Sequence, residues 1–184
     1  QTNDMNGIAL GYSSENAVVR NSIIDNNDDG IWLTHSSNHS ITENNIIGND
    51  DGILLQYSSN NTINRNNITA NSDFGIYLAY SNDNTISGNT VTNNGYVFGG
   101  GKELASSQNN MVSGNDIIAN NGNGIDLHDS SNNRVCRNDI IANNDDGINL
   151  VRYSSNNIIV GNNITDNWIG FDLWHSSHNI IFGN

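Results

Sequence analysis

Short apolar stretches with a period of two recur along the whole chain, separated by Ser, Asn, Asp and Gly. This alternation is typical of short strands and not of amphipathic helices. No hairpin spacing occurs, so each strand is expected to pair in parallel with its equivalent one repeat later. A glycine-led unit of the type GIxL opens each repeat, at Gly7, Gly30, Gly52, Gly75, Gly101, Gly124, Gly147 and Gly170.

The interval between these glycines is 22 or 23 residues, except for one interval of 26 residues after Gly75. The longer interval contains a small insertion at residues 95–100. The pattern predicts an all-β chain, a right-handed single-stranded parallel β-helix (β-solenoid) with about eight coils and three short strands per coil. We expect one domain over residues 1–184.

Asparagine occupies 40 positions and recurs at fixed places in each repeat. Stacked coils bring equivalent residues to about 4.8 Å from one another, so each amide can donate to the next and accept from the last. The sequence therefore predicts asparagine ladders at the corners of the coils.

The charge balance narrows the choice of partners. The chain has 6 Lys and Arg against 19 Asp and Glu, for a net charge of −13, which argues against nucleic acid and anionic lipid. No stretch approaches the roughly 20 apolar residues that span a bilayer, so no membrane insertion is expected. The single cysteine, Cys136, cannot form an internal disulfide.

The repeat GIxLxxSSNNxIxxNxIxxN resembles the parallel β-helix repeat family, including its carbohydrate-binding and sugar-hydrolase group and its surface-protein branch. The resemblance covers essentially the whole chain and implies the fold. Such relatives include polysaccharide lyases, hydrolases and epimerases, copper-maturation accessory proteins and surface proteins. Function must therefore be argued from sites.

A catalytic function would require a carboxylate or basic cluster that departs from the repeat. The most visible acidic residues instead recur before the coil glycines, as expected of a repeated turn. No catalytic residues are predicted from them, and the chain is expected not to be an enzyme. The same residues could hold calcium, since stacked carboxylates repel and oxygen ligands suit this ion. These residues are Asp28, Asp29, Asp50, Asp51, Asp73, Asp145 and Asp146.

An aromatic row suggests a second kind of site. Aromatic rings offer apolar faces and polar tips to sugars, so Trp32, Tyr57, Tyr77 and Tyr80 are candidate carbohydrate-binding residues. The alternative is that these rings stack on one another and shield the strand edges. Glycosylation sequons lie at Asn38, Asn60, Asn67 and Asn163.

Copper is a third chemical hypothesis, because two pairs of histidines could each place imidazoles close together. The pairs are His35 with His39, and His175 with His178. They lie in different coils and columns, so no common copper site is expected, and no cofactor is predicted beyond calcium.

The two ends lie close to an integer number of coils apart, and neither shows a capping helix. Exposed parallel edges invite strand addition, so head-to-tail self-association is expected. The sequence thus favours a non-catalytic structural β-solenoid outside the cell or on its surface, assembling into a filament, sheath or surface layer. A carbohydrate-binding module and a polysaccharide lyase, hydrolase or epimerase are the alternatives.

Overall fold

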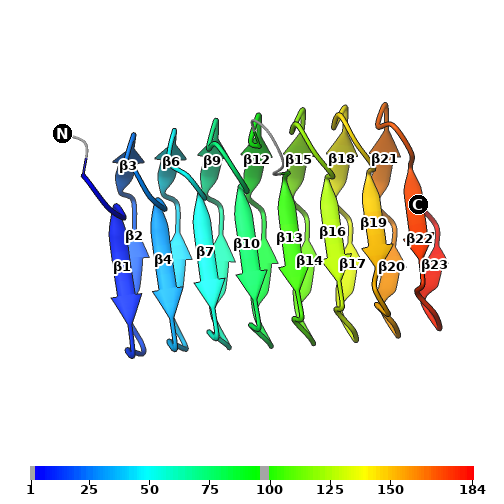
Figure 1. The fold of residues 1–184 in the computed structure, drawn as a ribbon, viewed down its shortest axis with the longest axis horizontal. Helices are drawn as coiled ribbons and strands as arrows, with labels where there is room; N and C mark the ends of the chain where they lie inside the picture. The colour runs from blue at the N-terminus through cyan, green and yellow to red at the C-terminus, as the bar shows by residue number, and fades with distance from the viewer. Residues whose placement is uncertain (1–2, 96–99) are drawn as a thin grey trace.

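The computed structural model describes residues 3–95 and 100–184 as a stack of coils built only from strands and turns. Figure 1 shows equivalent strands lying side by side along the long axis, from β1 at one end to β22 and β23 at the other. This confirms the predicted parallel β-helix. Seven coils have three strands each and the eighth has two. Residues 96–99 of the predicted insertion lie outside the described residues.

Three parallel sheets run the length of the stack, and every strand pairs with its equivalent in the next coil. The first sheet contains β1 Ile8–Gly11, β4 Ile31–Thr34, β7 Ile53–Gln56, β10 Ile76–Ala79, β13 Lys102–Ala105, β16 Ile125–His128, β19 Ile148–Val151 and β22 Phe171–Trp174.

The other two sheets have shorter strands of three residues. The second sheet contains β2 Ala17–Val19, β5 Ser40–Thr42, β8 Thr62–Asn64, β11 Thr85–Ser87, β14 Met111–Ser113, β17 Arg134–Cys136, β20 Ile158–Val160 and β23 Ile180–Phe182. The third contains β3 Ser22–Ile24, β6 Asn45–Ile47, β9 Asn67–Thr69, β12 Thr90–Thr92, β15 Asp116–Ile118, β18 Asp139–Ile141 and β21 Asn163–Thr165.

The core is a column of Ile, Leu and Val side chains from all three sheets. In the strands of the first sheet the first and third residues point inward, as in β4, where Ile31 and Leu33 are fully buried. The glycine before each of the first seven of these strands is required by close packing. A Cβ at Gly30 would lie 2.6 Å from Ile46 Cγ2 and 2.7 Å from the carbonyl oxygen of Gly52.

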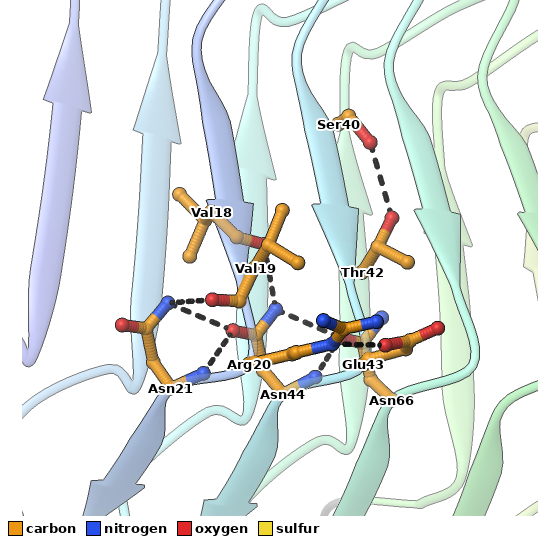
Figure 2. Close-up of polar contacts among 9 residues, drawn as sticks. All are labelled: Val18, Val19, Arg20, Asn21, Ser40, Thr42, Glu43, Asn44 and Asn66. Carbon is orange, nitrogen blue, oxygen red and sulfur yellow. Dashed lines mark hydrogen bonds and ion pairs between the residues drawn. The ribbon is translucent and has the colours of Figure 1, made fainter.

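Asparagine ladders join the coils at the corners, as predicted. Figure 2 shows one of them, in which the backbone N–H and the side-chain amide of Asn21 both donate to Asn44 Oδ1, at 2.9 and 3.0 Å. Asn44 donates in the same way to Asn66, with both bonds at 3.0 Å. Its amide also donates to the carbonyl of Val18 at 2.9 Å. Each ladder satisfies backbone groups that the turns would otherwise leave unpaired.

The surface charges add little to this framework. Arg20 and Glu43 form an exposed ion pair of 2.6 Å between neighbouring coils, also visible in Figure 2. Such a pair contributes at most about 1 kcal/mol because water screens it. The described part of the chain has no helix long and apolar enough to cross a bilayer.

Candidate active site on the outer face of the first sheet

The second residue of each strand in the first sheet faces outward, and the parallel register places these residues in one row, called here the outer row. The first four positions are apolar or aromatic. The last four are acidic or amide, so the row changes character between β10 and β13. Its members are Ala9, Trp32, Leu54, Tyr77, Glu103, Asp126, Asn149 and Asp172.

Glu103 and Asp126 are direct partners on neighbouring strands. Both carboxyl groups are largely shielded from water. Burial raises the pKa of Glu103 to about 7, and the negative charges of Asp126 and Asp73 add to the effect. Burial also raises the pKa of Asp126. A carboxyl group with a pKa of about 7 beside a second carboxyl group can give and take a proton near neutral pH, as acid–base residues in enzymes do.

The amides around Asp126 hold its carboxyl group in one orientation. Asn123 and Asn149 donate from their side chains to Asp126 Oδ2, at 3.0 and 3.3 Å. These hydrogen bonds favour the ionised form, and so does nearby His128, against the effect of burial. Asp126 Oδ1 is buried and has no hydrogen-bond partner within the described residues, and the same is true of Asn149 Oδ1. Two buried acceptor oxygens therefore lack a donor among the described residues.

A cavity of about 90 Å³ opens beside this pair. It is smaller than the roughly 300–1,000 Å³ of pockets that enclose small ligands, so it can admit one polar group of a ligand that lies across its mouth. A larger hollow of about 470 Å³ at the first coil has no ionisable lining residue. The smaller cavity is lined by Phe74, Gly100, Lys102, Glu103, Gly122, Asn123, Asp126 and Asp145.

Lys102 also departs from the repeat, but on the inner side of β13. In register it lies between Ile76 and Ile125, and it is 1 % exposed. Its Nζ has no hydrogen-bond partner among the described residues. Burial lowers the pKa of Lys102 well below its usual value, against a weaker opposing effect of Asp116. An amine in this position is neutral, because an ammonium ion would have no compensation for its lost hydration.

The aromatic residues predicted to bind carbohydrate separate into two places. Trp32 and Tyr77 lie in the outer row with Leu54 between them. Tyr57 and Tyr80 instead belong to an exposed corner stack, with their ring centroids 5.0 Å apart and nearly parallel. Stacking covers the ring faces that a sugar would need, so Tyr57 and Tyr80 are poor candidates for sugar binding. Trp32 and Tyr77 remain candidates, and they lie in the same row as the acidic pair.

Tyr77 connects the aromatic part of the outer row to the acidic part. It pairs in register with Glu103, and its ring lies 5.1 Å from that of Phe74, which lines the cavity. Burial and the charge of Glu103 raise the pKa of Tyr77, so its phenol remains protonated and can donate a hydrogen bond. The aromatic rings and the acid–base pair are thus neighbours in the outer row.

The aspartates predicted to bind calcium also fall into two groups. Ligand oxygens of Asp28, Asp29 and Asp50 lie within 4.8 Å of one another. Asp51 adjoins this group because its backbone N–H donates to Asp29 Oδ1 at 3.4 Å, and the charge of Asp73 contributes to the raised pKa values of Asp29 and Asp51. The remaining two candidates, Asp145 and Asp146, lie in a coil further along and are not part of it. Calcium binding at the first group stays a prediction.

Burial of these turn aspartates makes stability depend on pH. Burial is the main cause that raises the pKa of Asp51 to about 8. Because the folded state holds this proton more tightly than the unfolded state, the contribution of Asp51 to stability is complete below about pH 4 and is lost as the pH rises through about 8. We expect Asp51→Asn to be the more stable form by a few kcal/mol at about pH 9, with the difference vanishing in acid.

Thermal melts of the wild type and Asp51→Asn across this range test the expectation. Asp83→Asn, at an exposed corner, is the matched control and should follow the wild type at every pH. A stability difference that does not change with pH would contradict the assignment of a raised pKa to Asp51.

All four sequon asparagines, Asn38, Asn60, Asn67 and Asn163, are exposed. Their side chains are thus accessible to a glycosylating enzyme. Their use stays a prediction.

Comparison with protein-family models identifies the family of the chain. The model described as "Periplasmic copper-binding protein (NosD)" matches residues 1–102 and again residues 74–184. The chain belongs to the NosD family. No curated protein sequence matches the chain.

The residues described here do not fit the copper of that family description. Copper in proteins prefers imidazole, thiolate and thioether ligands. The candidate metal-ligand cluster found in the described residues consists of carboxylates alone. His39 is buried in a ladder, where its ring accepts a hydrogen bond from the backbone N–H of Asn16 at 3.0 Å and contacts Ser13.

Solved structures with the same fold include several enzymes. The T265N mutant of the periplasmic alginate epimerase AlgG matches with a TM-score of 0.85 and 24% identity, over 96% of this chain and 48% of that one. The A-module of the Azotobacter vinelandii mannuronan C-5 epimerase AlgE4 matches with a TM-score of 0.80 and 19% identity, over 99% and 56%. The Dettilon tailspike protein matches with a TM-score of 0.63 and 19% identity, over 81% and 42%.

This NosD-family chain spans about half the length of those proteins, and the likeness shows a common fold. It corrects two predictions made from the sequence. The chain was expected to be a non-catalytic structural solenoid and not an enzyme. The matching structures are named as polysaccharide epimerases and as tailspikes, one of which contributes an enzymatically active domain. The enzyme alternative is therefore better supported than the structural one.

The sequence contained the signal that this expectation overlooked. The aspartates in the turns recur from coil to coil, whereas the third residue of the GIxL unit varies. That position reads Ala, Trp, Leu, Tyr, Glu, Asp, Asn and Asp along the chain. The change after Tyr77 is the departure from the repeat that a catalytic site requires.

Proposed function

We propose that the chain carries the active-site face of a polysaccharide-modifying enzyme that works by acid–base catalysis outside the cytoplasm. The observation that carries the proposal is the in-register pair of shielded carboxyl groups, Glu103 and Asp126. The pair interrupts an otherwise regular repeat and adjoins a cavity. Buried ionisable groups with perturbed pKa values gather at functional sites more often than elsewhere.

The surroundings give the two carboxyl groups different roles. Glu103 has a pKa of about 7 and is protonated in much of the population at neutral pH, so it can serve as the acid. Asp126 accepts two amide hydrogen bonds that favour its ionised form, so it can serve as the base or the nucleophile. Asn123 and Asn149 are positioning residues, since they act through Asp126.

The outer row supplies a binding surface for a polymer. Trp32 and Tyr77 can place ring faces against sugar rings, and the polymer would cross successive strands toward Glu103. Enzymes named as alginate and mannuronan epimerases share this fold, which supports a polysaccharide as the class of substrate. The family description and the name of AlgG both include the word periplasmic, which supports a location outside the cytoplasm.

The test is turnover of soluble polysaccharides by the purified protein. We expect Glu103→Gln and Asp126→Asn each to lower the rate about 10²-fold, because each removes one member of the acid–base pair. Reducing ends, unsaturated uronates and proton exchange at sugar carbons would report hydrolysis, elimination and epimerisation. Asp83→Asn, distant in the coil, is the control and should keep the full rate. Turnover of no polymer, or equal rates in all variants, would contradict the proposal.

A further inference from the structure

The outer row and its margins carry negative charge that no nearby Lys or Arg neutralises. Beside burial, the charges of Asp126 and Asp73 raise the pKa of Glu103, and the charge of Asp145 raises the pKa of Asp126. Asp172 continues the row beyond Asn149. Any ligand that crosses this face therefore meets several carboxyl groups within a few coil spacings of about 4.8 Å.

The basic residues of the chain lie elsewhere. Lys102 is buried in the core with a lowered pKa. Arg152 follows β19, three residues beyond Asn149 at the far end of the strand. The other four belong to the second sheet or to the corner after it, and they are Arg20, Arg65, Arg134 and Arg137. The acidic half of the outer row thus has no Lys or Arg to receive a carboxylate ligand, and His128, two residues after Asp126 in β16, is the basic side chain that lies near it.

The hydrogen-bonding groups of the site also disfavour a carboxylate ligand. Asp126 Oδ1 and Asn149 Oδ1 are acceptors without a donor. Sugar hydroxyl groups can donate to them, whereas an ionised uronate carboxylate only accepts. Leaving such acceptors unpaired in a complex would cost binding energy, so these acceptors favour a hydroxyl group over a carboxylate at this point of the ligand.

From this charge and acceptor pattern, and resting on the function proposed above, we infer that the substrate is an uncharged polysaccharide and that the reaction is hydrolysis. Proton abstraction for elimination or epimerisation needs the carboxylate of a uronate to stabilise the resulting carbanion. In hydrolysis, Glu103 gives its proton to the glycosidic oxygen as the bond from that oxygen to C1 breaks. Asp126 bonds to C1 in place of that oxygen, because carboxyl groups on neighbouring strands about 4.8 Å apart suit the retaining mechanism. Glu103, now ionised, then takes a proton from the water whose oxygen displaces Asp126 from C1, so one water is added across the bond.

The test compares binding and products for two sets of polymers. Mannan, galactan, xylan and β-glucan are uncharged, and alginate and polygalacturonate are polyuronates. We expect at least one uncharged polymer to bind about tenfold more tightly than either polyuronate at low salt, with or without calcium, and to yield new reducing ends. Equal or tighter polyuronate binding, or binding to no polymer, would overturn the inference.

A second variant examines the cause of the selectivity. The double variant Glu103→Gln with Asp126→Asn removes two charges with little change in shape, so it should gain affinity for polyuronates, and Asp83→Asn should not. No gain would overturn the electrostatic basis. The enzymatic function and the preference for uncharged polymers can fail separately. Turnover of a polyuronate would support the enzymatic function and overturn the inferred substrate class. Binding of an uncharged polymer without any turnover would support the inferred selectivity and contradict the proposed enzymatic function.

Discussion

Replacement of Asn89 by alanine is expected to lower the free energy of unfolding by about 4 kcal/mol. Asn89 is 1 % exposed and lies at the middle of a ladder. Its amide donates to Asn115 Oδ1 and to the carbonyl of Ile63, both at 3.0 Å. Its Oδ1 accepts from the backbone N–H and the side chain of Asn66, both at 2.9 Å.

Alanine would leave these partners buried without a hydrogen bond, and each such group costs about 1–3 kcal/mol. Urea denaturation of the wild type and Asn89→Ala measures the change. Asn27→Ala is the matched control, because Asn27 is exposed and hydrogen-bonds through its backbone. A loss no larger than in the control would mean that the ladders contribute little to stability.

Replacement of Lys102 by isoleucine is expected to have the opposite effect and to raise the free energy of unfolding by about 3 kcal/mol at neutral pH. Isoleucine is the residue that its neighbours in the column, Ile76 and Ile125, already present to the core. The substitution removes an unpaired buried amine and adds apolar contact in the same column.

The pH dependence identifies the cause. The lowered pKa of Lys102 means that the unfolded state binds a proton that the folded state does not, so its cost grows as the pH falls below about 10. The advantage of Lys102→Ile should therefore be largest in acid and small in strong alkali. Lys102→Met, which keeps the length of the side chain, should show the same trend. Destabilisation in both variants would show that the amine has a stabilising partner.

The sequence predicted the fold well because the fold depends on repetition. Equivalent glycines, isoleucines and asparagines recur at fixed intervals, and parallel stacking is the arrangement that buries and pairs all of them at once. Each of these residues does the same thing in every coil, so one repeat predicts the next.

The candidate site was harder to predict because it consists of exceptions to the repeat. Glu103 replaces an apolar or aromatic residue, and Lys102 replaces an isoleucine one position earlier. The strand pattern shows which side of the sheet each of these two side chains faces. It does not show that neighbouring coils shield both side chains from water. The aromatic residues show the converse limit, since sequence could not tell that Tyr57 and Tyr80 stack on one another while Tyr77 adjoins Glu103.

The central claim is that Glu103 and Asp126 form one acid–base pair, and titration of the Glu103 carboxyl carbon by NMR tests it most directly. The account predicts a midpoint near 7 in the wild type. It also predicts a lower midpoint in Asp126→Asn, because the neighbouring negative charge is then gone. A midpoint near the ordinary value of about 4.3 in both proteins would show that the pair is solvated and uncoupled, and it would contradict the account.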